Sequence, residues 1–200
     1  MRERAMHATE ITESVIKRFG RVALGIDAGF GVWTGNRCAE YLGYGSVLDD
    51  VPVVSLESFV GVGNPASFVG LVSGERVLDV GCGAGLDCLV AAAAVGPEGA
   101  VVGVDITPEM IERANEAAAS MPSARVSFVV ADAAHRLPFG DGSFDAAQSN
   151  GCLNLSPRKP ELLAEVHRVL RPGGRLALCD AVLKPEKAAE VTSDPDNWSL

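Results

Sequence analysis

The stretch that decides the fold of this chain reads Arg76-Val77-Leu78-Asp79-Val80-Gly81-Cys82-Gly83-Ala84-Gly85. Aliphatic residues lead into three glycines at alternate positions, and an alanine-rich run follows them. A second apolar run, residues 101–104, then ends in Asp105. This order predicts a strand, a tight loop, a helix and a parallel strand, with a ligand site where the strand ends meet the loop.

Each residue type in this stretch suits a nucleotide ligand. Gly81, Gly83 and Gly85 allow positive φ and let a ligand approach the backbone closely. The helix expected from Leu86 would point its free N–H groups at the ligand. Asp105 follows Gly85 by 20 residues, about the interval at which an acid reaches a ribose diol.

The spacing of the glycines narrows the choice of nucleotide. A dinucleotide fingerprint is G-x-G-x-x-G, whereas this chain has G-x-G-x-G behind Asp79. The pattern therefore specifies no pyrophosphate site, and it disfavours a nicotinamide-dependent oxidoreductase. Asp79 either braces the loop or faces a cationic group of the ligand.

The composition is that of an ordinary globular chain, with 200 residues, 48% hydrophobic and 22% charged, which suits one domain. A net charge of −9 argues against a nucleic-acid partner, which needs a basic surface. Five cysteines in no zinc-finger spacing fit reduced thiols better than disulfides, and no metal site is expected. Because we find no signal peptide and no apolar run of about 18 residues, we expect a soluble, cytoplasmic protein with no membrane partner.

Three segments precede the decisive stretch. Residues 5–19 place apolar side chains on one helical face, which predicts a helix that packs on the domain or forms a lid. Residues 20–45 are rich in glycine and aromatic residues, which predicts an irregular loop that closes over a ligand. Residues 58–68 form either a connecting turn or a part of the ligand site.

From Arg76 onward, strands and helices are expected to alternate. Strands are predicted near 76–80, 100–104, 126–130, 144–148 and 175–180, and helices near 86–95, 108–120 and 160–170. The last helix is expected to stop at Pro172-Gly173-Gly174. This alternation predicts an α/β fold with a doubly wound, mostly parallel sheet, whose ligand lies across the carboxyl ends of the strands.

Two further strand ends carry polar side chains. Asp132 follows the third strand, where its carboxylate could accept a hydrogen bond from an exocyclic amine such as adenine N6. Asn150 and Cys152 follow the fourth strand, where a transferred group would meet its acceptor. Each of these ends could also be a structural turn, but polar ends in this order favour a site.

Taken together, residues 58–183 resemble a class I S-adenosylmethionine (SAM)-dependent methyltransferase, whose motif I has the form D-x-G-x-G-x-G. Residues 104–111 and the run from Ser149 to Pro157 resemble the arsenite methyltransferase family more closely. Gly61-Val62-Gly63-Asn64-Pro65 matches the G-C-G-N-P segment of that family with one substitution. The resemblance implies SAM as cofactor, S-adenosylhomocysteine (SAH) as product and a small-molecule acceptor.

The resemblance also implies a role for each candidate residue. It places Asp79, Gly81, Cys82, Gly83 and Gly85 at the methionine end of the cofactor. It assigns Asp105 to the ribose, Ile106 to the adenine face, and Asp132 with Ala133 to the adenine edge. Asn150 would lie near the methyl group, and Asn150 and Cys152 are the candidate catalytic residues. None of the three histidines, at 7, 135 and 167, is an evident general base.

The acceptor is where the chain departs from the arsenite family. Trivalent arsenic prefers two or three thiolates, yet Val62 and Gly151 stand where that family has cysteines. An arsenical site built from Cys152 and Cys38 remains an alternative, and so does a SAM-binding module without turnover. We expect residues 1–57 to form a cap segment and residues 58–200 the SAM-binding domain.

The residues after the fifth predicted strand lead to one more prediction. This fold normally continues beyond its fifth strand with a helix and an antiparallel strand pair, and roughly twenty residues after Asp180 are too few for both. The carboxyl-terminal strands therefore look truncated. We expect the sheet edge at 175–180 to be open, which could support a homo-oligomer.

Overall fold

The computed structural model describes residues 2–26, 34–182 and 184. Its centre is a five-stranded sheet in the order β3-β2-β1-β4-β5, in which every neighbouring pair is parallel. The strands are β1 (Arg76–Val80), β2 (Ala100–Asp105), β3 (Val126–Val130), β4 (Phe144–Asn150) and β5 (Leu170–Cys179). The order reverses next to β1, and this confirms the predicted doubly wound α/β fold.

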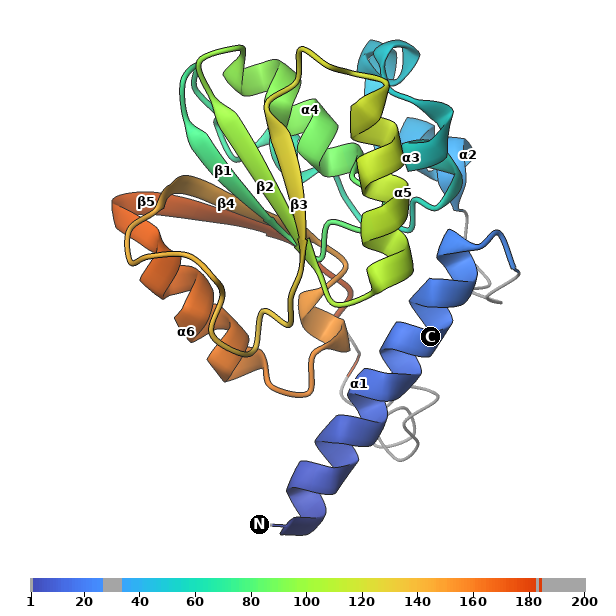
Figure 1. The fold of residues 1–200 in the computed structure, drawn as a ribbon, viewed down its shortest axis with the longest axis vertical. Coiled ribbons are helices and arrows are strands. Elements are labelled where there is room, and N and C mark those ends of the chain that lie inside the picture. Colours follow the sequence, from blue (N-terminus) through green and yellow to red (C-terminus); the bar gives the residue numbers. More distant parts are fainter. Residues whose placement is uncertain (1, 27–33, 183, 185–200) are drawn as a thin grey trace.

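Three helices cover the two faces of the sheet (Figure 1). The helices α4 (Leu86–Val95) and α5 (Pro108–Ala119) lie on one face, and α6 (Lys159–Val169) lies on the other. Successive residues of β1 point to opposite faces, as in any strand. Val77 packs in the core that holds Val95, whereas Leu78 packs in the core that holds Val166. The apolar run of the decisive stretch is therefore explained by burial on both faces.

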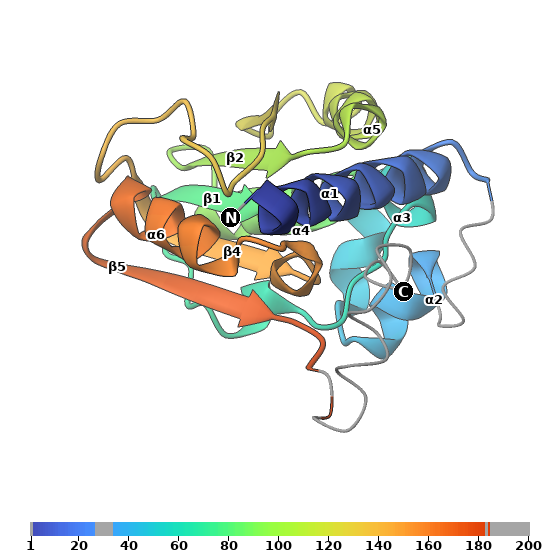
Figure 2. The same cartoon turned by 90° about the horizontal axis from the view of Figure 1, so that it is seen from below.

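The amino-terminal segment supplies α1 (Arg2–Ala23), α2 (Gly35–Tyr41), the short 3-10 helix η1 (Gly45–Asp50) and α3 (Val53–Glu57). Helix α1 packs along α5, and Figure 2 shows it crossing the carboxyl-end side of the sheet. Ile11 and Val15 are buried on its inner face, as the apolar spacing predicts. Two further 3-10 helices, η2 (Pro65–Ser67) and η3 (Leu153–Leu155), lie in connections.

The irregular loop predicted for residues 20–45 is partly wrong. Helix α1 continues to Ala23, and α2 forms where glycine and aromatic content suggested a loop. Cys38 and Ala39 of α2 are buried in the same core as Leu56 and Leu86, so tertiary packing outweighs weak local propensity. Residues 27–33 of the predicted loop lie outside the described residues.

The predicted end of α6 is also wrong. The helix ends at Val169 and β5 begins at Leu170, so the Pro-Gly-Gly run lies within a strand. Gly173 takes φ +79, and the register between β4 and β5 shifts after Phe144. A bulge of this kind absorbs a proline and glycines that a regular central strand would not.

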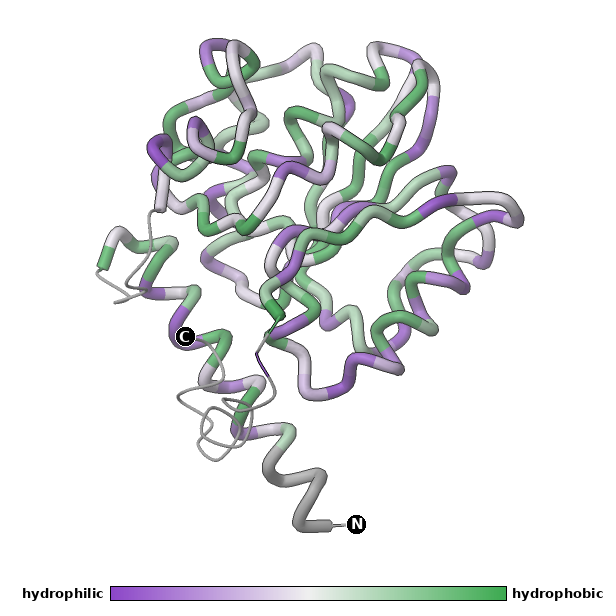
Figure 3. Tube along the Cα trace, turned by 180° about the vertical axis from the view of Figure 1, so that it is seen from behind, coloured by the Kyte–Doolittle hydropathy of each residue, from purple (hydrophilic) through white to green (hydrophobic). Residues whose placement is uncertain are grey.

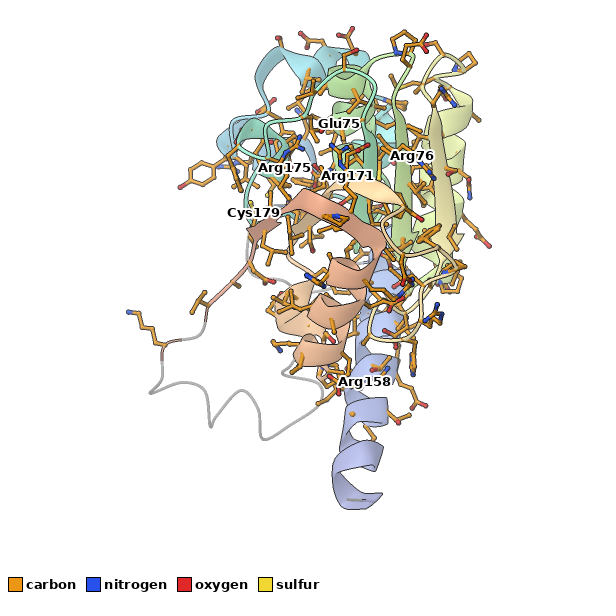
Figure 4. All side chains as sticks on the ribbon, turned by 90° about the vertical axis from the view of Figure 1, so that its left-hand side faces the viewer. Glu75, Arg76, Arg158, Arg171, Arg175 and Cys179 are labelled. Atoms are coloured by element: carbon orange, nitrogen blue, oxygen red, sulfur yellow. The ribbon has the colours of Figure 1, made fainter. Side chains whose placement is uncertain are left out.

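Figure 3 shows the central strands as mainly hydrophobic and α6 as alternating, which fits their two-sided and one-sided burial. In Figure 4, Glu75, Arg76, Arg171 and Arg175 gather at one end of the sheet, away from Arg158. The Arg175 guanidinium joins β5 to the connection before β1, because it donates to Glu75 and to the Val69 and Gly70 carbonyls. Among the described residues, no helix has the length and apolar character that a membrane crossing requires.

Candidate cofactor and acceptor site

One large cleft opens at the carboxyl ends of the strands, as the fold predicts. It contains about 1050 Å³ of empty space, including its open mouth. The loop after β1 and the ends of β2 and β4 form its floor, and the turn after β3 forms one side. Helix α1 closes part of it, since Thr12, Val15 and Phe19 contribute to the wall. Ser58, Phe59 and Val60 also line the cleft, so the 58–68 segment reaches the site.

The glycine loop, residues 81–85, has the backbone that the sequence pattern predicts. Gly81, Gly83 and Gly85 have φ values of +73, +51 and +87, which favour glycine. A Cβ at Gly81 would lie 2.4 Å from the Cβ of Cys152, so this glycine also allows a close approach. Gly85 does not line the cleft; instead it lets α4 pack against Phe128 of β3.

Asp105 joins the end of β2 to the glycine loop. Its Oδ2 accepts a hydrogen bond from the Gly83 N–H at 2.9 Å, and its Oδ1 accepts one from the Thr107 N–H at 2.8 Å. Burial raises the pKa of this carboxyl, and these two backbone donors oppose the rise. The Thr107 side chain and the Ile106 backbone also hydrogen-bond to this carboxyl. Asp105 and Ile106 both line the cleft, next to each other.

Asp132 is engaged more fully than the sequence suggests. Its Oδ1 accepts a hydrogen bond from the Ala134 N–H, and its Oδ2 contacts both Arg158 at 2.8 Å and His135 at 2.9 Å. Asp132, Ala133 and Arg158 all line the cleft, so an arginine that the sequence reading overlooked lies at the expected adenine end. Its side chain comes from the turn just before α6 (Figure 4).

Asn150 holds together four segments at the end of β4. Its Nδ2 donates to Asp87, to the Tyr44 hydroxyl and to the Gly63 carbonyl at 2.8–3.1 Å. Its Oδ1 accepts hydrogen bonds from the N–H groups of Val62 and Gly63. The asparagine therefore fixes the 61–63 segment against the strand end, in addition to lining the cleft.

Asp87 is a cleft residue that the sequence analysis did not identify, and Tyr44 is its hydrogen-bond partner. Asp87 lies in the first turn of α4 and lines the cleft, and its Oδ1 accepts a 2.5 Å hydrogen bond from the Tyr44 hydroxyl. Burial raises the pKa of Asp87 to about 6, against the lowering effect of Tyr44 and Asn150. Its position two residues after the glycine loop, at the start of a helix, is the sequence signal that could have identified Asp87.

Asp79 lies behind the cleft and does not line it. Its side chain is 1% exposed and accepts a hydrogen bond from the Cys88 thiol. Burial, and then the neighbouring charge of Asp87, raise its pKa well above the usual value. Of its two predicted roles, bracing the loop fits this position, and direct cofactor contact stays a prediction.

Cys152 and Cys38, the two thiols considered for an arsenical, have different surroundings. Cys152 lines the cleft, but its sulfur lies against Gly81, and burial raises its pKa. Cys38 is buried, donates to the Gly61 carbonyl and does not line the cleft, so only Cys152 of the two thiols proposed for an arsenical lines the cleft. Within the described ranges, no three His, Cys, Asp or Glu side chains form a group that could hold a metal ion.

The positions of the two replaced family cysteines lie side by side. A Cβ at Gly151 would come within 3.9 Å of both Val62 methyl groups. Two cysteines here would present their thiols together, whereas this chain presents an isopropyl group and a hydrogen atom. Valine 62 is 46% exposed, so this pair forms an apolar surface next to Asn150.

The residues present fit a nucleoside that carries an amino-acid chain. The glycine loop gives close access to the backbone, Asp105 brings a buried carboxylate to the cleft wall, and Asp87 offers a second buried negative charge. Polar groups that converge in a largely apolar cleft are the usual form of a small-molecule site.

Comparison with known proteins agrees with this geometry. A family model described as a methyltransferase domain matches residues 71–199. An arsenite methyltransferase of Halobacterium salinarum is 44% identical over 161 residues, which cover 80% of this chain and 40% of that protein. The 27-O-demethylrifamycin SV methyltransferase of Amycolatopsis mediterranei is 40% identical over 124 residues, or 62% of this chain and 44% of its own length.

A crystal structure is similar as well. It is the arsenic(III) S-adenosylmethionine methyltransferase CrArsM of Chlamydomonas reinhardtii, with a TM-score of 0.64 and 34% sequence identity. The match covers 76% of this chain and 55% of the algal protein. This chain thus spans less than half of each of the two relatives named above.

Proposed function

The chain belongs to the methyltransferase domain family, in its class I, SAM-dependent branch near the arsenite methyltransferases, and we propose that it transfers a methyl group from SAM to a small-molecule acceptor. The observation that carries this proposal is the cradle formed by the glycine loop and Asp105 at the strand ends. When bound, SAM supplies a sulfonium-activated methyl group, which an acceptor nucleophile takes while SAH is left as the thioether.

The work of the chain is mainly to bind and align. We assign the glycine loop to the amino-acid end, Asp105 to the ribose hydroxyls, and Ile106 to the adenine face. Ala133 and Asp132 lie at the adenine edge, where Asp132 is already bonded to Arg158. Helix α1 and the 58–60 segment cover part of the cleft, and we assign them to excluding water, which together with fixed orientation accounts for much of the rate in transfers of this kind.

The side chains around the acceptor position favour a small organic molecule over arsenite. Of the proteins compared above, the Halobacterium salinarum relative and the algal structure are named for arsenic, and the Amycolatopsis mediterranei relative is named for a demethylated rifamycin. Val62 and Gly151 put an apolar surface where paired thiols would bind arsenic, and Cys152 is turned toward Gly81. We therefore place a partly apolar acceptor against Val62, with Asn150 between it and the cofactor.

Binding measurements test the cofactor assignment. Isothermal titration of SAM and SAH into the wild type and Asp105→Ala should show binding by the wild type and a loss of about tenfold to hundredfold in the variant, since hydrogen bonds to a charged group are removed. Asp50→Asn, an exposed carboxylate outside the cleft, is the control. Equal affinity for all three proteins would remove Asp105 from the ribose role.

Turnover measurements separate an enzyme from a binding module. Incubation with SAM and a panel of small acceptors should yield SAH. If SAM binds tightly and no member of a broad panel releases SAH, the proposal of catalysis fails and the module alternative stands. Cytoplasmic location, the lack of a nucleic-acid partner, self-association and the division at residue 57 stay predictions.

A further inference from the structure

A buried carboxylate in the cleft has no cationic partner among the described residues. The side chain of Asp87 is 6% exposed and lines the cleft. Its two oxygens accept hydrogen bonds from neutral donors, the Tyr44 hydroxyl at 2.5 Å and the Asn150 amide at 3.0 Å. In the described part of the chain, no Lys, Arg or His forms an ion pair with it.

A second buried acid, Asp79, adds negative charge next to Asp87. Asp79 is 1% exposed, and its charge interacts repulsively with that of Asp87. The hydrogen-bond donors to Asp79 are again neutral, the Cys88 thiol and Gln148, and the charge of Asp105 also repels that of Asp79. Two carboxylates buried together cost free energy unless a cation or a proton compensates them. The site therefore attracts one positive charge at the point where Asp87 meets the cleft.

We propose that Asp87 is the counter-ion for the α-ammonium group of the cofactor's amino-acid chain, with Tyr44 and Asn150 as its positioning residues. This inference rests on the proposed function. Asp87 lies two residues after the glycine loop, which we assign to the amino-acid end of SAM. Its position in the first turn of α4 places its charge in the favourable field of a helix amino terminus.

The chemistry of SAM selects the ammonium over the other charged groups. The carboxylate of SAM would repel Asp87, and the sulfonium has no hydrogen to donate. An ammonium carries three donors, and Asp87 keeps about two free lone-pair positions after binding Tyr44 and Asn150. Charge-assisted hydrogen bonds of this type are stronger than neutral ones.

Tyr44 and Asn150 fix the direction of the carboxylate from two separate elements. Tyr44 follows α2 in the amino-terminal segment, and it also contacts the Gly63 carbonyl. Asn150 ends β4 and donates to Tyr44 as well as to Asp87. The site thus connects the amino-terminal segment, α4 and β4, so that the amino-acid end of the cofactor is held at their junction.

The test compares SAH with an SAH analogue in which a hydroxyl replaces the α-amino group. Isothermal titration in the wild type should show the analogue binding about tenfold to hundredfold more weakly. The affinity of Asp87→Asn for SAH should be lower than that of the wild type by a similar factor. The ratio of the dissociation constants of the analogue and of SAH should fall to less than about threefold in this variant. Asp50→Asn, with an exposed carboxylate removed, should behave as the wild type.

The Asp87→Asn variant can keep its internal hydrogen bonds. If the new amide turns its oxygen to Asn150, its NH₂ group faces the Tyr44 oxygen, which can accept. Thermal melting in the absence of ligand checks that the variant is folded. Tyr44→Phe is a second variant that keeps the carboxylate. It should bind SAH several-fold more weakly while preserving most of the preference for SAH over the analogue.

Three results would overturn the inference. One is an equal penalty for the analogue in the wild type and in Asp87→Asn, which would place the ammonium elsewhere. Another is a loss in Asp87→Asn that affects SAM but not SAH, which would place Asp87 at the sulfonium. A wild type that binds neither SAM nor SAH would reject the proposed function itself, and the inference with it.

Discussion

The contact between Gly81 and Cys152 allows a sharp test of the site's construction. In Gly81→Ala, the new Cβ would lie 2.4 Å from the Cys152 Cβ and 2.5 Å from its sulfur, at a φ of +73. The left-handed backbone costs about 1–2 kcal/mol for alanine, and overpacking adds about 1–3 kcal/mol. We expect the variant to lose about 2–5 kcal/mol of unfolding free energy.

Gly83→Ala is the matched control. Gly83 has a φ of +51, but the nearest atom to its new Cβ is the Met110 sulfur at 3.9 Å. This variant should lose about 1–2 kcal/mol, from the backbone alone. The difference between the two variants isolates the contact with Cys152.

A double-mutant cycle measures that contact directly. Cys152→Gly removes both clashing atoms, so Gly81→Ala should cost about 1–3 kcal/mol less in its presence. Cys152→Ala keeps the Cβ at 2.4 Å and should rescue little. Urea denaturation with a common m-value provides the free energies. Additive effects, or a Gly81→Ala variant as stable as Gly83→Ala, would refute the close packing of the two segments.

Three further predictions follow from the same structure. Because burial raises the pKa of Asp87 from 3.8 to about 6, the folded protein binds this proton more tightly than the unfolded chain, so stability falls as pH rises through that window. The free energy of unfolding of Asp87→Asn, measured by urea denaturation relative to the wild type, should therefore rise by up to about 3 kcal/mol between pH 4 and pH 7. A difference in unfolding free energy that stays constant with pH would contradict the assignment. Arg175→Met should lose about 1–3 kcal/mol by leaving Glu75 and the Val69 carbonyl without their donor, and Arg175→Lys should recover only part of it, since an ammonium cannot reproduce the planar fork. Val62→Cys with Gly151→Cys should bind a trivalent arsenical that the wild type does not, as measured by arsenic retained after gel filtration, and each single variant should retain much less.

The parts of the structure that follow from local pattern were predictable. The sequence predicts the strands and the loop of residues 76–105 to within one or two residues. It does so because the apolar run at 76–80, the glycines after it and Asp105 are local signals, read from neighbouring positions. The cleft at the strand ends follows from the parallel order alone. Of the predicted site residues, Asp79 and Gly85 do not line the cleft, because Asp79 is buried against Cys88 and Gly85 packs against Phe128.

The parts that depend on long-range packing were not predictable in the same way. Tyr44 bonds to Asp87 across 43 residues and to Asn150 across 106, and no local spacing reports such pairs. Helix α2 forms because Cys38 and Ala39 are buried, although its sequence begins with glycine and asparagine. Arg158 lies just before α6 and contacts Asp132, which is 26 residues away in the sequence, so no local pattern indicates this pair.

The position of α1 has a consequence for every affinity measured on this protein. Thr12, Val15 and Phe19 form part of the cleft wall, while the core that α1 shares with Met110 is small. If cofactor binding requires the docked helix, the observed dissociation constant equals the intrinsic constant divided by the fraction of molecules with this helix docked. Hydrogen exchange in α1 should slow as cofactor is added, and amides of β1 should exchange slowly in either state. Docking of one amino-terminal helix and binding of the cofactor are, in this sense, thermodynamically coupled.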